Sequence, residues 1–431
     1  MTAKSTTPFR DLWKVPGYAI YFASRFAFHL LIRMLVVVIG WHVYELTGDP
    51  LHLGFVGLAM FLPILVIGVF AGDWADRFNR AWLVAIGFLA AAVSIAGLFL
   101  LSFQSSPDLL LVYVAALLFG AAVALAKPAL WALLPQVVPA EMLASAVNIS
   151  TIGGQSATIA GPAFAGLLLL AGPASGYAGV GLAALAGAVL SLRLAPLATV
   201  PPQRETGETT AQRLLAGLSY IWATPILLGM VLLDLFAVLF GSVVVLLPAF
   251  AKDILEVGPA GLGLLRAAPA VGAVFAAFVL ARAMPRRKAG TAMLGFTALF
   301  GLSAFVFAIS RDFTLSLVAL GIGGAADTVS VVMRHTVLQL GTPDAVRGRV
   351  NAASQIFISA SNEVGDFRAG AVAGWLGVVP AAAVGGLCTV LVAALCAWRF
   401  PALRGLADPG SLSAGIGAGI GLATPKPVSA S

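Results

Sequence analysis

The feature that most constrains this chain is a series of apolar runs, each long enough to cross a lipid bilayer as a helix. Spanning the hydrocarbon takes about 20 apolar residues in a helix. The chain is 60% hydrophobic and 10% charged, whereas soluble domains have about 25% charged residues. Strands of a β-barrel would instead alternate over segments of about ten residues. The sequence therefore predicts an all-α membrane protein.

Twelve such runs are expected, six on each side of a polar stretch. They cover residues 18–44, 54–71, 82–103, 109–130, 146–170, 176–194, 225–249, 258–284, 290–309, 313–340, 350–376 and 378–398. The predicted organisation is a terminal segment (1–17), a six-helix bundle (18–194), a linker with a short interfacial helix (195–224), a second bundle (225–398) and a tail (399–431). The tail is rich in Gly, Ala, Ser and Pro from residue 408 and is expected to be disordered.

The two halves resemble copies of each other. Gln136 precedes Asn148 by twelve residues, and Gln339 precedes Asn351 by the same interval. The Gly57-to-Pro63 spacing recurs later in the chain with nearly the same offset. This pattern favours two related, pseudo-symmetric six-helix bundles.

The basic residues predict the topology. If the N-terminus is inside, nearly all Lys and Arg residues of the loops face the cytoplasm, and only Lys252 and Arg311 face outside. Both termini are therefore expected in the cytoplasm. The net charge of +7 is explained by these loops, so no nucleic-acid partner is expected.

Neither a disulfide nor a metal site is expected. Cys388 and Cys396 lie eight residues apart on one predicted helix, which is too far for a disulfide. No cluster of histidines or cysteines has the spacing of zinc ligands.

Four carboxylates inside predicted spans are candidates for proton coupling, because a charge in a span is costly. They are Asp234 in the seventh span, Asp327 in the tenth, and Glu363 and Asp366 in the eleventh. Burial favours the protonated carboxyl, whereas a nearby arginine favours the carboxylate. A group between these influences can exchange protons.

Other polar residues are candidates for a substrate cavity. Arg25, His29 and Arg33 recur every four residues along the first span, and Arg334 and Asn362 lie in the tenth and eleventh. The alternative is that these groups pair with one another and fix helix positions, or that His29 is an ordinary interior histidine.

Asp327 and Arg334 share one helix face but are about 10 Å apart by helix rise, so partners on other helices are expected. Lys127 and Arg368 are interpreted as helix-end or snorkelling residues.

The fifth predicted span carries Gly161, Pro162 and Gly166. Small residues permit close packing and proline permits a bend, so this segment is a candidate hinge. Core packing is the alternative and is compatible with that role.

The loop Gly72-Asp73-Trp74-Ala75-Asp76-Arg77-Phe78-Asn79-Arg80 resembles the G-x-x-x-D-R-x-G-R signature of the major facilitator superfamily. Gly72, Asp76, Arg77 and Arg80 match, whereas Asn79 stands where glycine is usual. The resemblance implies a loop that stabilises the outward-facing state. The Gly161-Pro162 segment is similar to the antiporter motif of exporters in that superfamily.

Residues 41–48, 343–350 and 361–370 are similar to the enterobactin-exporter-like branch of the superfamily. The resemblance implies twelve helices, a bacterial inner membrane, and export of a siderophore-like metabolite or a drug.

The predicted function is secondary transport, with proton-coupled export of a small molecule by alternating access. The proton gradient supplies the driving force, no cofactor is implied, and the chain is expected to work as a monomer in the bilayer. An importer or a lysophospholipid-type flippase on the same fold is the nearest alternative. A non-transporting sensor or scaffold and a membrane enzyme are more distant ones, since His29, His42, His52 and His335 form no predicted catalytic cluster.

Overall fold

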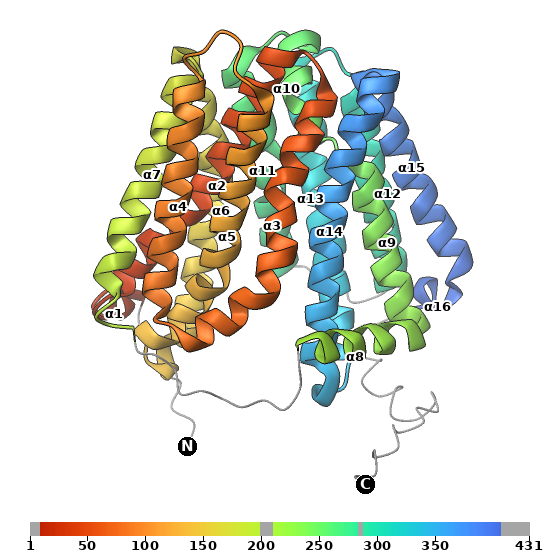
Figure 1. The fold of residues 1–431 in the computed structure, drawn as a ribbon. Helices are drawn as coiled ribbons and strands as arrows, with labels where there is room; N and C mark the ends of the chain where they lie inside the picture. The colour runs from red at the N-terminus through yellow and green to blue at the C-terminus, as the bar shows by residue number, and fades with distance from the viewer. Residues whose placement is uncertain (1–8, 199–209, 283–287, 407–431) are drawn as a thin grey trace.

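The computed structural model describes residues 9–198, 210–282 and 288–406, and it is built of helices throughout these ranges (Figure 1). The first eight residues, most of the polar linker and the segment from residue 407 onward lie outside the described ranges. The expectation of a disordered tail therefore concerns residues that are not described.

The first half contains a short helix and six long ones. Their bounds are α1 (Phe9–Leu12), α2 (Tyr18–Thr47), α3 (Pro50–Arg77), α4 (Arg80–Leu101), α5 (Leu109–Val137), α6 (Leu143–Leu168) and α7 (Pro173–Leu194). Short 3-10 turns, η1 (Ala140–Met142) and η2 (Leu169–Ala171), flank α6.

The second half begins with the linker helix α8 (Thr210–Ala223). Its other elements are α9 (Pro225–Gly241), η3 (Val244–Leu246), α10 (Leu247–Ala249), the π-helix η4 (Phe250–Ile254), α11 (Gly258–Arg282), α12 (Ala289–Ile309), α13 (Phe313–Leu340), α14 (Asp344–Leu376), α15 (Val378–Arg399) and α16 (Pro401–Arg404).

Eleven helical segments of the described chain are long and apolar enough to cross a membrane. The remaining predicted span is α14, which at 33 residues has ample length. Glu363, Asp366 and Arg368 lower its apolar character. The prediction of an all-α membrane protein is confirmed.

Several helices begin where the sequence supplies a side-chain cap. Asp49, Asn79, Asp108 and Asp312 accept hydrogen bonds from the first free backbone N–H groups of α3, α4, α5 and α13. Such caps stabilise a helix terminus by about 1 kcal/mol. They explain why long apolar helices are separated by very short loops.

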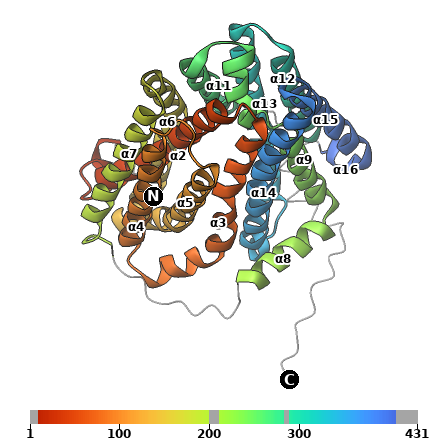
Figure 2. The ribbon, with the colours of Figure 1, turned by 45° about the horizontal axis from the view of Figure 1, so that its top comes forward.

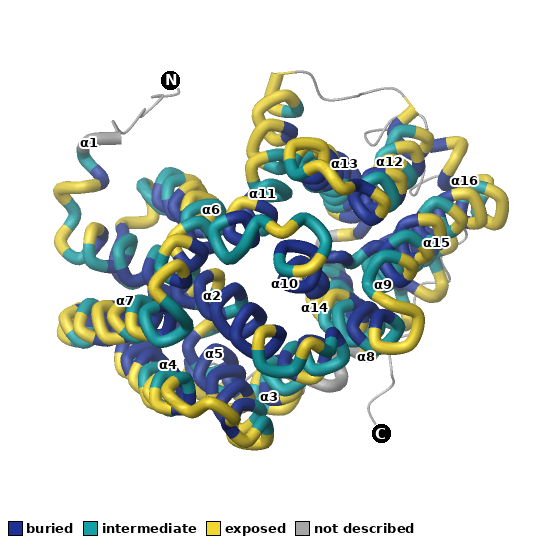
Figure 3. Tube along the Cα trace, turned by 90° about the horizontal axis from the view of Figure 1, so that it is seen from above, coloured by how far each residue is buried: buried dark blue, intermediate teal, exposed yellow. Residues whose placement is uncertain are grey.

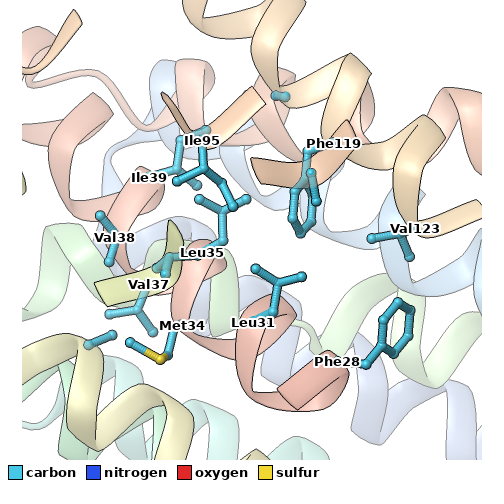
Figure 4. Close-up of a cluster of buried hydrophobic side chains, with 14 of the residues drawn as sticks. Phe28, Leu31, Met34, Leu35, Val37, Val38, Ile39, Ile95, Phe119 and Val123 are labelled. Atoms are coloured by element: carbon cyan, nitrogen blue, oxygen red, sulfur yellow. The ribbon is translucent and has the colours of Figure 1, made fainter. Parts of the chain in front are cut away.

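The helices of the two halves lie side by side as two groups (Figures 1 and 2). Between the groups, α3 packs against α14 and α6 packs against α11. Buried residues concentrate on α2 and around α10 at the centre, and exposed residues lie on the periphery (Figure 3). The centre of the first half is apolar: Leu35 of α2, Ile95 of α4 and Phe119 of α5 belong to one cluster of buried hydrophobic side chains (Figure 4).

The two halves approach most closely at one end of the molecule, which we call the closed end. A Cβ added to Gly370 of α14 would lie 2.8 Å from the Pro50 carbonyl oxygen of α3. A Cβ on Gly166 of α6 would lie 2.6 Å from the Pro259 carbonyl oxygen of α11. Such distances leave no room for a side chain, so glycine is required for these contacts.

The opposite end carries α8, α1 and α16 (Figure 1), and we call it the α8 end. In this half of the molecule α3 bends away from α14 (Figure 1). The two halves therefore meet at the closed end and diverge toward the α8 end.

The seventh predicted span differs from the expected continuous helix over 225–249. It breaks after Gly241 and resumes as η3, α10 and η4. Residues Pro225–Ile254 are long and apolar enough to cross a membrane, as predicted, but they do not form one continuous helix. The break was not expected because the apolar run continues through it. Irregular backbone inside a membrane needs polar partners from the protein, and these are supplied by side chains described below.

Candidate functional site

A cavity of about 240 Å³ lies between the two halves. Its walls come from α2, α3 and α5 on one side and from η3, α11 and α14 on the other. Most lining residues are apolar, and the charged ones are Arg33, Arg266, Glu363 and Asp366. Arg33 is exposed although it lies in the middle of α2, which shows that its side chain faces open space between the halves.

The polar face of α2 packs on the glycines of α6. A Cβ on Gly154 would lie 3.2 Å from the His29 ring, and one on Gly161 would lie 2.8 Å from Cβ of Arg33. The helix α6 continues through Pro162. The small residues predicted as a hinge therefore make room for the predicted cavity residues of α2, whereas their role as a hinge remains a prediction.

Arg25 is 4% exposed and lies near the α8 end of α2. Its Nη1 donates to the Tyr21 hydroxyl at 3.1 Å, and its guanidinium lies 4.2 Å from the ring centroid of Trp131 on α5. Its Nε is buried and has no hydrogen-bond partner. Lys127, one turn before Trp131, is exposed.

The break in the seventh span is held by charged side chains. Arg368 donates from Nε to the Leu239 carbonyl and from Nη2 to the Phe240 carbonyl, each at 2.8 Å. These carbonyls end α9 and have no partner within the helix. Arg368 is thus a cap for a broken helix, and its interpretation as a snorkelling residue was wrong.

Asp366 belongs to the same arrangement. Its carboxylate accepts a hydrogen bond from the Ser242 hydroxyl in the break. Arg266 of α11 donates to the Val244 carbonyl at 3.3 Å, and both Arg266 and Arg368 lie near enough to act on the Asp366 charge. Three charged residues therefore stabilise non-helical backbone at this point.

A second cavity, of about 200 Å³, lies inside the second half between α9, α13 and α14. In its wall, Oδ1 of Asp234 lies 2.6 Å from Nη2 of Arg334. Both side chains are nearly buried, at 11% and 10% exposure. The expectation that Arg334 has a partner on another helix agrees with this ion pair.

Asp327 also lines the second cavity. Within the described residues it has no hydrogen bond or ion pair, although it lies within electrostatic range of both Arg334 and Asp234. His335 and Asn362 contribute further polar groups to the wall. Two carboxylates thus share one arginine in a largely apolar environment.

Glu363 faces the central cavity. No hydrogen bond or ion pair involves it in the part of the chain that the structure describes, and the charged residues that line the same cavity are Arg33, Arg266 and Asp366. Asn362 instead donates from its side-chain amide to the Ile358 carbonyl of its own helix, and it lines the second cavity. These neighbours on α14 therefore serve different cavities.

The charged loop between α3 and α4 is fixed within the first half. Nη2 of Arg80 lies 3.0 Å from Oδ1 of Asp76, and Nη1 donates to the Ala132 carbonyl of α5. Asn79 donates to the Ala195 and Ala198 carbonyls after α7. A Cβ at Gly72 would have no atom within 4 Å, and Arg77 is exposed, with no hydrogen bond or ion pair among the described residues.

One contact at the closed end has no signal in the sequence. The Tyr44 hydroxyl of α2 donates to Oδ2 of Asp253 in η4 at 2.5 Å, and Lys252 lies over the Tyr44 ring. The partners are 209 residues apart; Tyr44 lies in the segment 41–48 that resembles the exporter branch, but that resemblance does not indicate this bond, and Asp253 lies in none of the segments that carry the resemblance. This bond joins the two halves directly.

The described residues contain no group of three or more metal-ligating side chains, and Cys388 and Cys396 are both free thiols.

Comparison with known proteins adds to this geometry. The profile of a family described as transmembrane secretion effector (MFS_3) matches residues 8–409. The chain is 29% identical over 368 residues to the enterobactin exporter EntS of Escherichia coli strain HS, covering 84% of this chain and 86% of the relative. The EntS protein of Escherichia fergusonii matches with the same values.

Solved structures with the same fold are more distant in sequence. A bacterial homologue of the human lysosomal transporter Spinster superposes with a TM-score of 0.70 at 15% identity, covering 90% of this chain and 98% of the other. The nucleoside transporter NupG gives a TM-score of 0.70 at 14% identity, covering 90% and 99%. These matches confirm the fold of major facilitator transporters.

Proposed function

The chain belongs to the transmembrane secretion effector family of major facilitator transporters, and on that basis we propose that it exports a small molecule in exchange for protons. It is a multi-pass membrane protein and a transporter. The coupling ion, the direction of transport and the cargo are our proposals. The observation that carries them is the central cavity, bounded by both halves and shut at the closed end.

Alternating access requires a site between two bodies that open in turn to each side. The cavity around Arg33 and Glu363 meets that requirement. The positive-inside rule would place the α8 end in the cytoplasm. On this assignment both termini are cytoplasmic, the described conformation faces inward, and cargo enters from the cytoplasm of a bacterial cell.

Proton coupling is supported by the charges of the second cavity. Asp234, Asp327 and Arg334 together carry one excess negative charge if both carboxylates are ionised. An uncompensated charge in a low-dielectric interior is strongly disfavoured, and two carboxylates that share a site take up one proton in preference. We assign proton binding to this pair, with Arg334 shared between them.

The other two carboxylates fit different roles. Asp366 holds the broken seventh span through Ser242, so its substitution is expected to affect folding first. Glu363 faces Arg33 across the central cavity and is suited to respond to bound cargo. It is therefore the second candidate for coupling.

Similarity to the EntS relatives favours a siderophore-like metabolite as the cargo, with a drug as the alternative. Each chain contains both halves of the cavity, which supports function as a monomer.

Export can be tested by comparing small molecules outside and inside bacterial cells with and without the gene, in iron-poor and iron-rich medium. Cells producing the Asp234→Asn/Asp327→Asn variant and the exposed-surface variant Arg193→Gln serve as controls. A metabolite that leaves wild-type and Arg193→Gln cells but is retained by the double variant would support the proposal. Equal export by the double variant would refute proton coupling through this pair. Inward accumulation would refute export.

A further inference from the structure

We propose that the cargo carries an anionic group, and that the first half of the transporter binds it through Arg33 and Lys127, with Arg25 beside them. This inference rests on the proposed transport function, and it names the chemical class of cargo selected by Arg33, in the wall of the central cavity, and by the two cations that follow it toward the α8 end. It comes from the distribution of charge between the two halves.

The interior charges of the described helices are not balanced. We count a charged residue as interior if it lies at least six residues from both ends of its helix. By this criterion the described helices contain six interior basic residues and four interior acidic ones, a surplus of two positive charges. The basic residues are Arg25, Arg33, Lys127, Arg266, Arg334 and Arg368, and the acidic ones are Asp234, Asp327, Glu363 and Asp366.

All four interior carboxylates lie in the second half. The described first half has acidic residues only near helix ends or in loops, so Arg25, Arg33 and Lys127 have no carboxylate of their own half nearby. In the second half Arg334 pairs with Asp234, and Arg368 caps carbonyl groups beside Asp366. The excess positive charge therefore lies in the first half, with Arg33 in the wall of the central cavity.

These three cations are close together. Arg25 and Arg33 lie two turns apart along α2, and the Arg25 guanidinium lies 4.2 Å from the ring centroid of Trp131, one turn after Lys127 on α5. Lys127 is exposed and lies one turn beyond Val123, which lines the central cavity, while Glu363 of the other half lies in the wall of that cavity. Glu363 can balance one of the three charges, so two remain for a ligand.

The state of Arg25 gives an independent indication of a ligand. Arg25 is 4% exposed and its Nη1 donates to the Tyr21 hydroxyl, yet its buried Nε has no hydrogen-bond partner among the described residues. A buried charged group without its partners is unfavourable. Its guanidinium lies over the ring of Trp131, a residue that is 52% exposed. An anion attached to a flat ring system would satisfy the charge and contact the exposed indole.

The inference can be tested by equilibrium binding, with no ion gradient present. Purified full-length protein in detergent is titrated at one fixed pH against two xanthene dyes, the anionic carboxyfluorescein and the cationic rhodamine 6G, and fluorescence polarisation is recorded. The variants are Arg33→Gln and Lys127→Gln, with Lys127→Arg to retain the charge. Arg193→Gln removes an exposed arginine at the end of α7 and is the matched control.

Wild-type protein, Lys127→Arg and Arg193→Gln are expected to bind the anionic dye more tightly than the cationic dye. Each neutral variant should lose roughly tenfold in affinity for the anionic dye, as expected for one charge-assisted hydrogen bond. Equal binding of both dyes, preference for the cation, binding of neither, or unchanged affinity in both neutral variants would overturn the inference. Because no gradient is used, anion binding without proton-driven transport would refute only the proposed function.

Discussion

Asp234 of α9 and Arg334 of α13 form a nearly buried ion pair, with 2.6 Å between Oδ1 and Nη2. Asp327 lies on the same helix as Arg334 and lines the same cavity without a partner of its own among the described residues. Among the described residues Arg334 is the one arginine or lysine that lines this cavity, and His335 is the other basic side chain beside the two carboxylates. This arrangement links the stability of the second half to its proposed protonation.

Replacing Arg334 by Gln is expected to destabilise the protein by about 3–5 kcal/mol, because it leaves a buried carboxylate without its partner. The double variant Arg334→Gln/Asp234→Asn should recover most of that loss. Thermal unfolding in detergent provides the measurement, with Arg193→Gln as a control that changes little. An Arg334→Gln variant as stable as wild type would show that the pair contributes nothing.

The closed end should be sensitive to the size of residue 370. Gly370→Val would push a side chain against the Pro50 carbonyl, whereas nothing lies within 4 Å of a Cβ at Gly348 on the same helix. The test uses protein with Cys388 and Cys396 replaced by Ser and a single reporter, Leu53→Cys, in the central cavity. Gly370→Val should increase labelling by an impermeant maleimide added at the closed end, and Gly348→Val should not. Equal labelling in both would mean that this contact does not close the cavity.

The loop between α3 and α4 should influence the balance between the two conformations. Asp76 pairs with Arg80 in the described conformation, and its side chain is 71% exposed, so it is available for other contacts when the halves rearrange. Asp76→Ala should lower labelling of Leu53→Cys from the closed end, because the resemblance implies that this loop favours the outward-facing state. The neighbouring variant Asp73→Ala is the control. Equal labelling of Leu53→Cys in the Asp76→Ala and Asp73→Ala variants would show that Asp76 does not influence the conformational balance.

The bond between Tyr44 and Asp253 should help to hold the closed end shut. Tyr44→Phe removes this bond between the halves while retaining the ring, and a lost bond to a charged group corresponds to about 1.5–3 kcal/mol. A tenfold or larger rise in the labelling rate of Leu53→Cys from the closed end is expected. Tyr113→Phe removes a bond to His52 within the first half and should leave the rate unchanged. A rate in Tyr44→Phe equal to wild type would contradict a gating role.

The positions of the spans could be predicted because bilayer thickness imposes a minimum length on each apolar run. The tenth span, Phe313–Leu340, matches the expectation at both ends. The break after Gly241 could not be predicted, because its apolar sequence continues unchanged. That break depends on Arg368, which is distant in the chain and reaches the freed carbonyls only in the folded protein.

In the candidate site, too, some features could be predicted from the sequence and others could not. Charge within an apolar run identified Asp234, Asp327, Glu363 and Arg334 as residues that need an explanation. Their partners could not be identified, because pairing depends on how α9, α13 and α14 face one another. Trp131 and Tyr44 were missed since single aromatic residues in spans are ordinary core components.

The most direct test of proton-coupled export is a measurement of proton flux in proteoliposomes that contain the purified transporter and a pH-sensitive dye. The molecule identified by the cellular comparison is added on one side without an imposed gradient. We predict that its movement through wild-type protein drives protons in the opposite direction, and that Asp234→Asn/Asp327→Asn protein shows no cargo-dependent proton flux. Movement of the cargo without any proton flux in the wild-type protein would contradict the account.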